Sequence, residues 1–334
     1  MKNQEKIFVI GHKNPDTDSI CSAIAYCDIK NRTTQESRYI PKRAGQINEE
    51  TEYVLNRFGV HPPGYLSNIG TQVKDMDIRL SPEANKSMSL KNAWDLMQEN
   101  SIVSLPIREK DGTLEGLITI GDIAKTYMDT TDSYLLSRAR TQYQRIAETI
   151  GGKVIEGNAH GYFIQGKVMV ATANPDKMKE YVEENDMVIM GNREEDHLQA
   201  IEQNVSCIIV GMGIEVTEKV LKLAHEKDIV IISSPYDTFT ISRLINQSIP
   251  VKYIMKTDNL VTFNTEDFTD DIQEVMIKHR HRAFPVINKK GKCIGTISRR
   301  NFLDMHRKKV VLVDHNEKDQ AVDNIDKADI MEII

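Results

Sequence analysis

The chain has 334 residues, and its 43 Lys and Arg against 49 Asp and Glu give a net charge of −6. This length exceeds a single ordinary core and predicts two or more domains, and the 40% apolar and 28% charged residues are typical of globular proteins. The sequence has no basic run, no apolar run of about 18 residues and no signal-peptide pattern, so we expect a cytoplasmic protein without a nucleic-acid or membrane partner.

The first predicted element is a strand over Ile7–Ile10, whose four apolar residues run without a polar interruption. Such a run is typical of a parallel strand that is buried on both faces. A polar loop with Pro15 follows, and helical spacing of apolar residues starts at Ile20. The loop therefore joins a strand end to a helix N-terminus, which is where open α/β sheets hold their ligands.

This loop carries an imidazole and two carboxylates, His12, Asp16 and Asp18. If the loop is extended, Asp16 and Asp18 project to the same side, and His12 can converge on them from the strand end. Carboxylate oxygen with imidazole nitrogen is a ligand set for Mn²⁺, Mg²⁺ or Co²⁺. The same aspartates are also ordinary turn and helix-cap residues, and spacing alone leaves both interpretations open.

A second short strand is predicted over residues 37–41 and a helix over residues 48–58, with an acidic first turn. Glycine and proline residues at positions 59–64 end this helix and indicate a first domain boundary.

An internal repeat with a constant offset of 179 positions lies beyond this boundary, and it relates Pro106 to Pro285, Gly116 to Gly295 and Asp122 to Asn301. Each copy predicts a helix, a strand, a tight turn, a second strand and a second helix. The first helices are expected over Leu90–Glu99 and over residues 269–279.

The segment between the two copies predicts an α/β domain over residues 133–248. It opens with a helix over residues 135–150 that Gly151 and Gly152 end. Apolar runs then alternate with helical patterns at residues 168–171, 188–190, 207–210 and 229–232.

The last part of the chain predicts a buried strand over residues 310–313, with Asp314 directly after it. If this strand neighbours Ile7–Ile10 in one sheet, Asp314 lies beside the first loop and could bridge two metals, with His315 orienting the ligands. Residues 328–334 predict one more strand.

Three segments, GHKNPDTDSICSAIAY, AGQINEETEYVLNRFGV and VVLVDHNE, resemble the family II inorganic pyrophosphatases, manganese-dependent members of the DHH phosphoesterase superfamily. The resemblance implies hydrolysis of pyrophosphate to two phosphates, with Mn²⁺ or Co²⁺ on the protein and Mg²⁺ on the substrate. It implies metal ligands at His12, Asp16, Asp18 and Asp314, and a catalytic role for these residues and His315. Two metals about 3.5 to 4 Å apart would activate water and neutralise phosphoryl charge.

The repeats resemble CBS modules through Gly116 to Asp122 and Gly295 to Asn301, and residues 187–213 resemble a DRTGG domain. CBS modules usually bind adenine nucleotides such as AMP, ADP, ATP or diadenosine polyphosphates. The resemblance implies contacts to phosphate, ribose and base from Ile107, Thr119, Asp122, Arg282, Val286, Ser298, Arg299 and Asn301. The Thr-x-x-Asp spacing is also a capping pattern, so a purely local role stays open.

We therefore expect an α/β protein in which a DHH-type parallel-sheet domain is interrupted by two α+β CBS modules that flank an α/β DRTGG domain. The expected ranges are 1–65 with 309–334 for the DHH-type domain, 70–131 and 250–308 for the two CBS modules, and 133–248 for the DRTGG domain. We also expect a homodimer that forms through the CBS and DRTGG region.

The 334 residues contain neither the DHH triplet nor the C-terminal substrate domain of the family. One metal position keeps its ligands and the second is incomplete, so we expect little or no turnover from this chain alone. A non-catalytic adenine-nucleotide sensor and another DHH phosphoesterase remain alternatives.

Overall fold

A computed structural model describes residues 6–35, 38–128, 132–171, 175–279, 281–303, 305, 307–313 and 322–334. The chain divides into two compact units. Unit 1 comprises Met1–Arg79, Phe263–Lys289 and Ile297–Ile334, and unit 2 comprises Leu80–Thr262 and Lys290–Thr296. Within the described residues, no helix is both long and apolar enough to cross a membrane.

Unit 1 contains a parallel five-stranded sheet in the order β18-β17-β1-β2-β3. Its strands are β1 (Ile7–Ile10), β2 (Tyr39–Arg43), β3 (Gly64–Tyr65), β17 (Lys309–Leu312) and β18 (Asp329–Ile333). The central strand β1 pairs with β17 on one side and β2 on the other. Its side chains alternate between two cores, because Ile10 packs with Leu312 on one face and Val9 packs with Val311 on the other.

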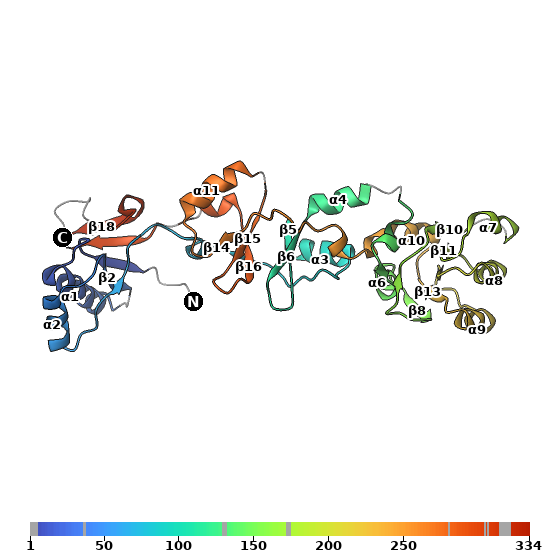
Figure 1. Ribbon diagram of the computed structural model, residues 1–334, viewed down its shortest axis with the longest axis horizontal. Coiled ribbons are helices and arrows are strands. Elements are labelled where there is room, and N and C mark those ends of the chain that lie inside the picture. Colours follow the sequence, from blue (N-terminus) through green and yellow to red (C-terminus); the bar gives the residue numbers. More distant parts are fainter. Residues whose placement is uncertain are drawn as a thin grey trace. The chain divides into compact units, whose positions relative to one another are not determined.

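Two helices follow the first two strands, α1 (Thr17–Thr34) and α2 (Glu49–Arg57), and both are visible beside the sheet in Figure 1. Asp16 caps α1 by accepting a hydrogen bond from the Ser19 amide at 2.9 Å. Asn48 caps α2 in the same way through the Thr51 amide at 2.8 Å. These caps satisfy amide groups that the first turn of a helix leaves unpaired, which explains where both helices begin.

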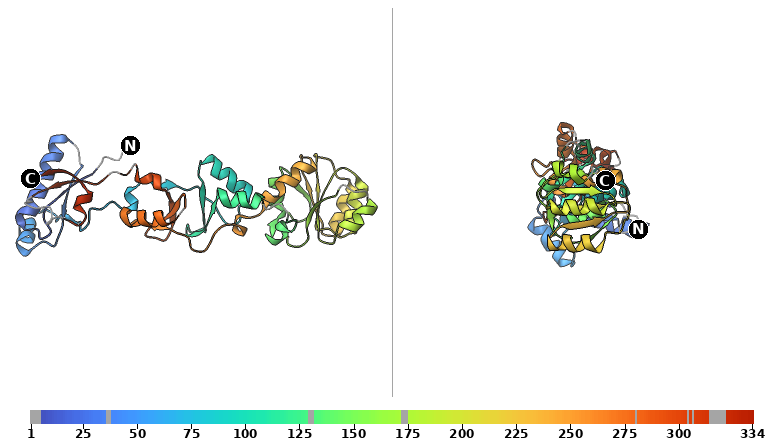
Figure 2. Two further views of the ribbon diagram at one scale, coloured as in Figure 1. Left: turned by 90° about the horizontal axis from the view of Figure 1, so that it is seen from above. Right: turned by 90° about the vertical axis from the view of Figure 1, so that its right-hand side faces the viewer.

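Unit 2 contains a second five-stranded sheet in the order β10-β11-β12-β13-β8. Four strands are parallel, β10 (Val168–Val170), β11 (Met187–Met190), β12 (Cys207–Val210) and β13 (Val230–Ser233), and β8 (Lys153–Glu156) is an antiparallel edge. Helices α7 (Pro175–Tyr181), α8 (Glu194–Glu202) and α9 (Glu218–Glu226) cover one face, and α6 (Tyr143–Thr149) and α10 (Thr238–Leu244) cover the other (Figures 1 and 2). Because both faces are covered, the inner strands β11 and β12 are apolar and buried along their whole length.

The single helix expected over residues 135–150 is wrong. The structure has α5 (Leu135–Arg138), a short strand β7 (Thr141–Gln142) paired with β9 (Tyr162–Phe163), and then α6. Arg140 adopts a left-handed conformation with φ of 52°, which ends α5 because a helix needs negative φ. The hydroxyl of Thr141 then donates to the Leu136 carbonyl at 2.9 Å and holds the turn.

The first repeat copy forms α3 (Leu90–Glu99), β5 (Ser104–Arg108), β6 (Leu114–Thr119) and α4 (Ile120–Met128). The second copy forms β14 (Phe263–Asn264), α11 (Thr269–Lys278), β15 (Phe284–Ile287) and β16 (Cys293–Ile297). The second helix expected in this copy is replaced, among the described residues, by the 3-10 helix η4 (Arg299–Phe302). Two further 3-10 helices, η2 (Ile245–Ser248) and η3 (Val251–Tyr253), connect the α/β sheet of unit 2 to the second copy along the chain.

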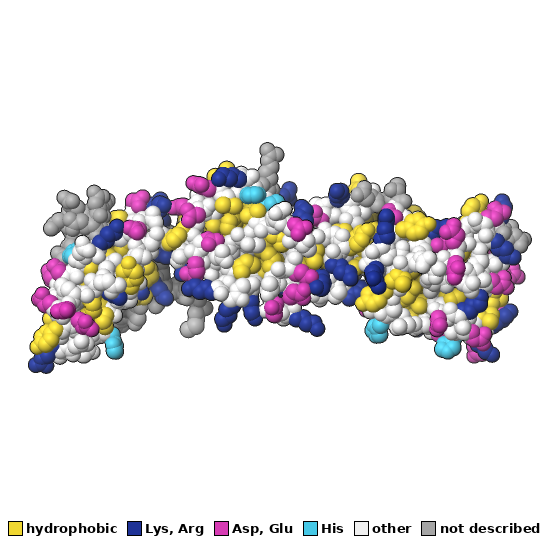
Figure 3. All heavy atoms as spheres, in the orientation of Figure 1, with side chains coloured by type: hydrophobic (Ala, Val, Ile, Leu, Met, Phe, Trp, Pro, Cys, Tyr) yellow, Lys and Arg dark blue, Asp and Glu magenta, His cyan; other side chains and the backbone are white. Residues whose placement is uncertain are grey.

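Lysine and arginine side chains are interspersed with aspartate and glutamate on the face shown in Figure 3.

Candidate functional site

The first candidate site lies in unit 1, where β1 and β17 end side by side. The two strands pair in parallel with Ile10 opposite Leu312, and the Val313 amide donates to the Ile10 carbonyl at 3.1 Å. The expectation that these strands are neighbours is therefore confirmed. His12 follows β1 at this edge. Asp314 and His315 follow Val313 in the sequence but lie outside the described residues.

His12 and Asp16 converge within the loop after β1. The His12 Nε2 atom lies 3.8 Å from Asp16 Oδ1, and the two side chains are 18% and 59% exposed. Gly45 packs directly against the loop, since a Cβ atom there would lie 1.9 Å from the Lys13 carbonyl oxygen. Lys13 also forms an ion pair with Asp323 at 2.7 Å. The loop is thus held from two directions and does not depend on local turns alone.

Residues 16–18 do not form one extended segment, because α1 begins at Thr17. Asp16 is the N-cap of this helix, and Asp18 lies in its first turn, where its Oδ1 accepts a hydrogen bond from the Ser22 hydroxyl at 3.1 Å. The local role left open by the sequence is therefore present for both aspartates. The same Asp16 oxygen, Oδ1, accepts the capping hydrogen bond from Ser19 and is the atom nearest to His12 Nε2.

The donor atoms present fit a divalent metal in part. Two ligands of one octahedral ion, each about 2.1 Å from the metal, lie about 3 Å apart, so the 3.8 Å between His12 and Asp16 needs only a small side-chain adjustment. An imidazole nitrogen with carboxylate oxygens suits manganese or cobalt. Among the residues that the structure describes, no three His, Cys, Asp or Glu side chains gather into a metal-binding group. Completion of the ligand set by Asp314 stays a prediction.

The second candidate site lies in the first repeat copy, at the junction of β6 and α4. Asp122 Oδ2 accepts hydrogen bonds from the Thr119 amide at 2.9 Å and from the Thr119 hydroxyl at 2.6 Å. The Lys256 ammonium lies 3.5 Å from Asp122 Oδ1. Ile107 is fully buried on β5, opposite Gly116 of β6. The structure brings Thr119 and Asp122 together, in the reciprocal arrangement of a capping box.

The second copy repeats this arrangement within unit 1. Asn301 Oδ1 accepts from the Ser298 amide at 2.7 Å and from its hydroxyl at 2.8 Å, and its Nδ2 donates to the Asp77 carbonyl at 2.6 Å. Arg299 donates hydrogen bonds to the Met276 carbonyl and to the His279 carbonyl, and its expected role as a cation for phosphate stays a prediction. Of the two remaining expected residues, Val286 is buried on β15 and Arg282 is exposed.

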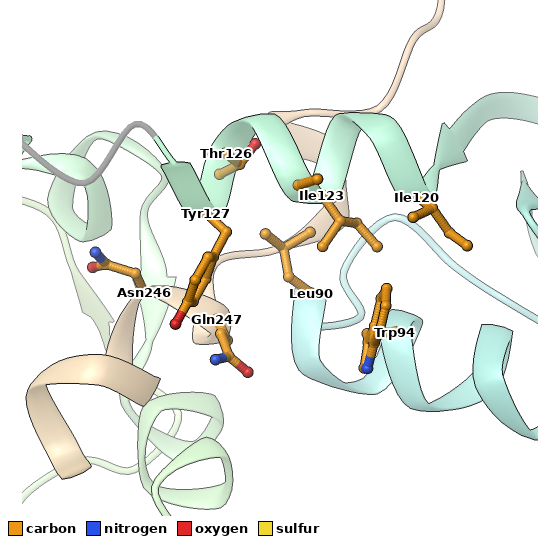
Figure 4. A pocket seen from close by; sticks show the side chains of 9 residues that line it. Leu90, Trp94, Ile120, Ile123, Thr126, Tyr127, Asn246 and Gln247 are labelled. Carbon is orange, nitrogen blue, oxygen red and sulfur yellow. The ribbon is translucent and has the colours of Figure 1, made fainter.

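A third feature, not expected from the sequence, is an apolar cavity of about 300 Å³ between α3, α4 and η2 of unit 2 (Figure 4). The rings of Trp94 and Tyr127 and the side chains of Leu90 and Ile123 face it, and Gln247 lies at one side. Leu90 with Trp94 and Ile123 with Tyr127 are spaced four apart on their helices, which is the pattern that could have indicated a shared apolar face. The cavity is thus lined by two helices of the first repeat copy and by η2, which precedes the second copy in the chain.

Family models match three segments of the chain. The DRTGG domain model matches residues 145–248, and the CBS domain model matches residues 77–129 and 251–308.

The chain is 38% identical, over 99% of its length, to a cobalt-dependent inorganic pyrophosphatase of Clostridium perfringens, and it covers 60% of that protein. It is 31% identical, over its full length, to a probable manganese-dependent inorganic pyrophosphatase of Thermotoga maritima, and it covers 61% of that protein. The chain thus spans about three fifths of the length of these relatives.

Among solved structures, the chain is similar to the CBS and DRTGG domains of the regulatory region of the Clostridium perfringens pyrophosphatase, which were crystallised with the activator diadenosine tetraphosphate. The sequence identity is 34% and the TM-score 0.65, over 69% of this chain and all of that structure. Together with the similarity of the whole chain to both relatives, this shows that the chain belongs to the family of inorganic pyrophosphatases that contain CBS and DRTGG domains.

Proposed function

We propose that the protein of which this chain is a part hydrolyses inorganic pyrophosphate to two phosphates with a divalent metal, Mn²⁺ or Co²⁺, bound at the β1 edge. The observation that carries this proposal is the similarity to a cobalt-dependent inorganic pyrophosphatase over 99% of the chain, with the His12 and Asp16 pair in the matching segment. Pyrophosphate would enter as its Mg²⁺ complex.

His12 and Asp16 would hold the metal, with Asp18 and Asp314 adding carboxylate oxygens. When bound, the metal would lower the pKa of a water molecule and neutralise phosphoryl charge. The residues described here keep the donor atoms in place: the N-cap hydrogen bond fixes Asp16, and the Gly45 contact and the Lys13 ion pair hold the loop that carries His12.

Mn²⁺ binding to the full chain tests the metal role without depending on turnover. Electron paramagnetic resonance of free Mn²⁺ measures the affinity of the wild type, of Asp16→Asn and of the control Asp28→Asn, which removes an exposed carboxylate of α1 that pairs with Arg32. We expect a loss of about tenfold in affinity for Asp16→Asn, because metal ligands contribute strongly to affinity, and no change for Asp28→Asn. Absence of Mn²⁺ and Co²⁺ binding by the wild type would contradict the metal role.

We further propose that the two repeat copies bind adenine nucleotides, AMP, ADP, ATP or diadenosine polyphosphates, and that this binding regulates hydrolysis. The support is the CBS match of both copies and the similarity to a regulatory region that was crystallised with diadenosine tetraphosphate. Ligands regulate only when they bind two arrangements of the protein unequally.

A non-catalytic nucleotide sensor is the second candidate function. Asp16 and Asp18 already accept hydrogen bonds within α1, so local structure alone can account for both carboxylates without a metal.

We propose a homodimer that forms through the CBS and DRTGG region, in the cytoplasm. Apolar side chains on α3 and α4 support it, since Trp94 is 37%, Tyr127 42% and Met128 80% exposed in the single chain. Exposed apolar side chains on neighbouring helices are typical of interaction surfaces.

A further inference from the structure

Lys256, in the second segment that the CBS domain model matches, forms an ion pair with Asp122 of the first repeat copy. The ammonium nitrogen lies 3.5 Å from Asp122 Oδ1, although the two residues are far apart in the sequence. Both residues belong to unit 2. Asp122 is the carboxylate that the proposed nucleotide binding assigns to ribose. Lys256 therefore stands beside a group expected to contact ligand, and none of the sequence patterns indicated it.

The backbone of Lys256 is fixed at this position. Its amide donates to the Leu117 carbonyl and its carbonyl accepts from the Leu117 amide, both at 2.9 Å. Gly116 permits this close approach, because a Cβ atom there would lie 2.9 Å from the Lys256 carbonyl oxygen and 2.8 Å from the Met255 sulfur. Since β6 continues from Leu117 to Thr119, the same strand places Lys256 next to the Thr119 and Asp122 pair.

The two carboxylate oxygens of Asp122 have different surroundings. Oδ2 is occupied by the amide and hydroxyl of Thr119, whereas Oδ1 faces the Lys256 ammonium. The Asp122 side chain is 18% exposed and the Lys256 side chain 58%. A ligand hydroxyl that donates a hydrogen bond to Oδ1 would thus lie beside the Lys256 ammonium. This ammonium is exposed to solvent and has three N–H donors, so it can also donate to the ligand.

The charge of Asp122 creates a problem for an anionic ligand. A phosphate group near a partly buried carboxylate is repelled, and the repulsion grows with each added negative charge because little water screens the two groups. A compact ammonium at 3.5 Å from the carboxylate offsets this repulsion and can itself attract phosphate oxygen.

We propose that Lys256 determines the charge specificity of the first repeat copy: it offsets the negative charge of Asp122, so that the site accepts adenine nucleotides and prefers those with more phosphate charge. This inference rests on the proposed nucleotide binding, and it adds a residue and a direction of preference to it.

Calorimetric titration of the full chain with adenosine, AMP and ATP tests the inference. The variants are Lys256→Gln, which removes the charge, Lys256→Arg, which keeps it, and the control Lys125→Gln, which removes an exposed lysine from α4 of the same copy. The fluorescence of Trp94, the single tryptophan of the chain and part of α3 in that copy, gives a second readout.

We expect Lys256→Gln to weaken ATP binding roughly tenfold, AMP binding roughly threefold and adenosine binding hardly at all, because Coulomb attraction scales with ligand charge. Lys256→Arg and Lys125→Gln should bind like the wild type, and added salt should reduce the difference between wild type and Lys256→Gln. Equal weakening for all three ligands would mean a structural role and would overturn the inference, as would an unchanged ATP affinity. If the wild type binds none of the three ligands, the proposed nucleotide regulation fails at the first step.

Discussion

At the scale of single residues, Gly11 shows how tightly the loop after β1 is built. A Cβ atom at this position would lie 1.7 Å from the Ser19 hydroxyl oxygen and 3.0 Å from Ser19 Cβ. Ser19 is 1% exposed, so its side chain cannot turn away into solvent. Glycine is needed here for space, because the start of α1 lies against the end of β1.

We expect Gly11→Ala to lower the free energy of unfolding by about 1 to 3 kcal/mol, the usual cost of overpacking a buried position. Ser19→Ala removes the oxygen that the new Cβ would meet, so the double variant should regain part of that loss. Gly121→Ala is the control, because a Cβ atom there meets nothing nearer than 3.6 Å. Urea unfolding of the four variants measures the effect, and equal stability of Gly11→Ala and Gly121→Ala would contradict the steric argument.

Residue contacts differ in how far the sequence predicts them. His12 and Asp16 are close in sequence, and their convergence follows from a strand end next to a helix start. The side chains of Thr119 and Asp122 are likewise brought together by a local pattern. The Lys256 contact with Asp122 depends on a strand edge that pairs with a distant segment, and no local pattern encodes such a pairing.

At the scale of elements, the strands were the best predicted. The expected strand over Ile7–Ile10 and the strand over residues 207–210 match β1 and β12, because continuous apolar runs suit parallel strands with both faces covered. The helix over residues 135–150 was wrong, since its apolar spacing continues through a left-handed residue, Arg140, that periodicity does not detect. The cap role that the sequence left open for Asp16 is confirmed, because Asp16 is the N-cap of α1.

The contact between α9 and β8 predicts a dependence of stability on pH. His225 Nδ1 lies 3.0 Å from Glu156 Oε1, and this hydrogen bond raises the pKa of His225 and lowers the pKa of Glu156. Because the pKa of His225 is higher in the folded state, its contribution is complete below its ordinary value of about 6.5 and is lost as the pH rises through the raised value. The contribution of Glu156 is present above its ordinary pKa and is lost as the pH falls. The pair is therefore most stabilising at pH values between the ordinary pKa of Glu156 and the ordinary pKa of His225.

We expect His225→Gln to unfold at a lower urea concentration than the wild type at about pH 5.5 and at the same concentration at about pH 8.5. The effect is small, since the His225 side chain is 79% exposed. His61→Gln, in the exposed segment after α2, is the control and should show no pH-dependent difference. A difference between wild type and His225→Gln that is the same at both pH values would show that the ion pair is not its cause.

At the scale of the whole molecule, the two units carry different parts of the proposed function. Unit 1 holds the strand edge with His12 and Asp16, and unit 2 holds the Thr119, Asp122 and Lys256 group. The second repeat copy has residues in both units, with its Ser298 and Asn301 pair in unit 1. A nucleotide-dependent rearrangement of the second copy would thus involve the unit that carries the proposed metal residues, which is the coupling that regulation requires.

The proposed homodimer gives the last prediction. The apolar faces of α3 and α4 leave Trp94 and Met128 open to water in the single chain, and their burial against a second copy would be favourable at about 25 cal/mol for each Å² of apolar surface. We expect light scattering to give twice the 38.0 kDa mass for the wild type and a single mass for Met128→Glu, because a buried unpaired carboxylate opposes association. Trp94→Glu should act in the same direction. Tyr53→Glu, on the exposed side of α2 in unit 1, is the control and should stay dimeric. A monomeric wild type would contradict the proposed homodimer. A dimer that Met128→Glu leaves intact would mean that these residues of α3 and α4 do not form the interface.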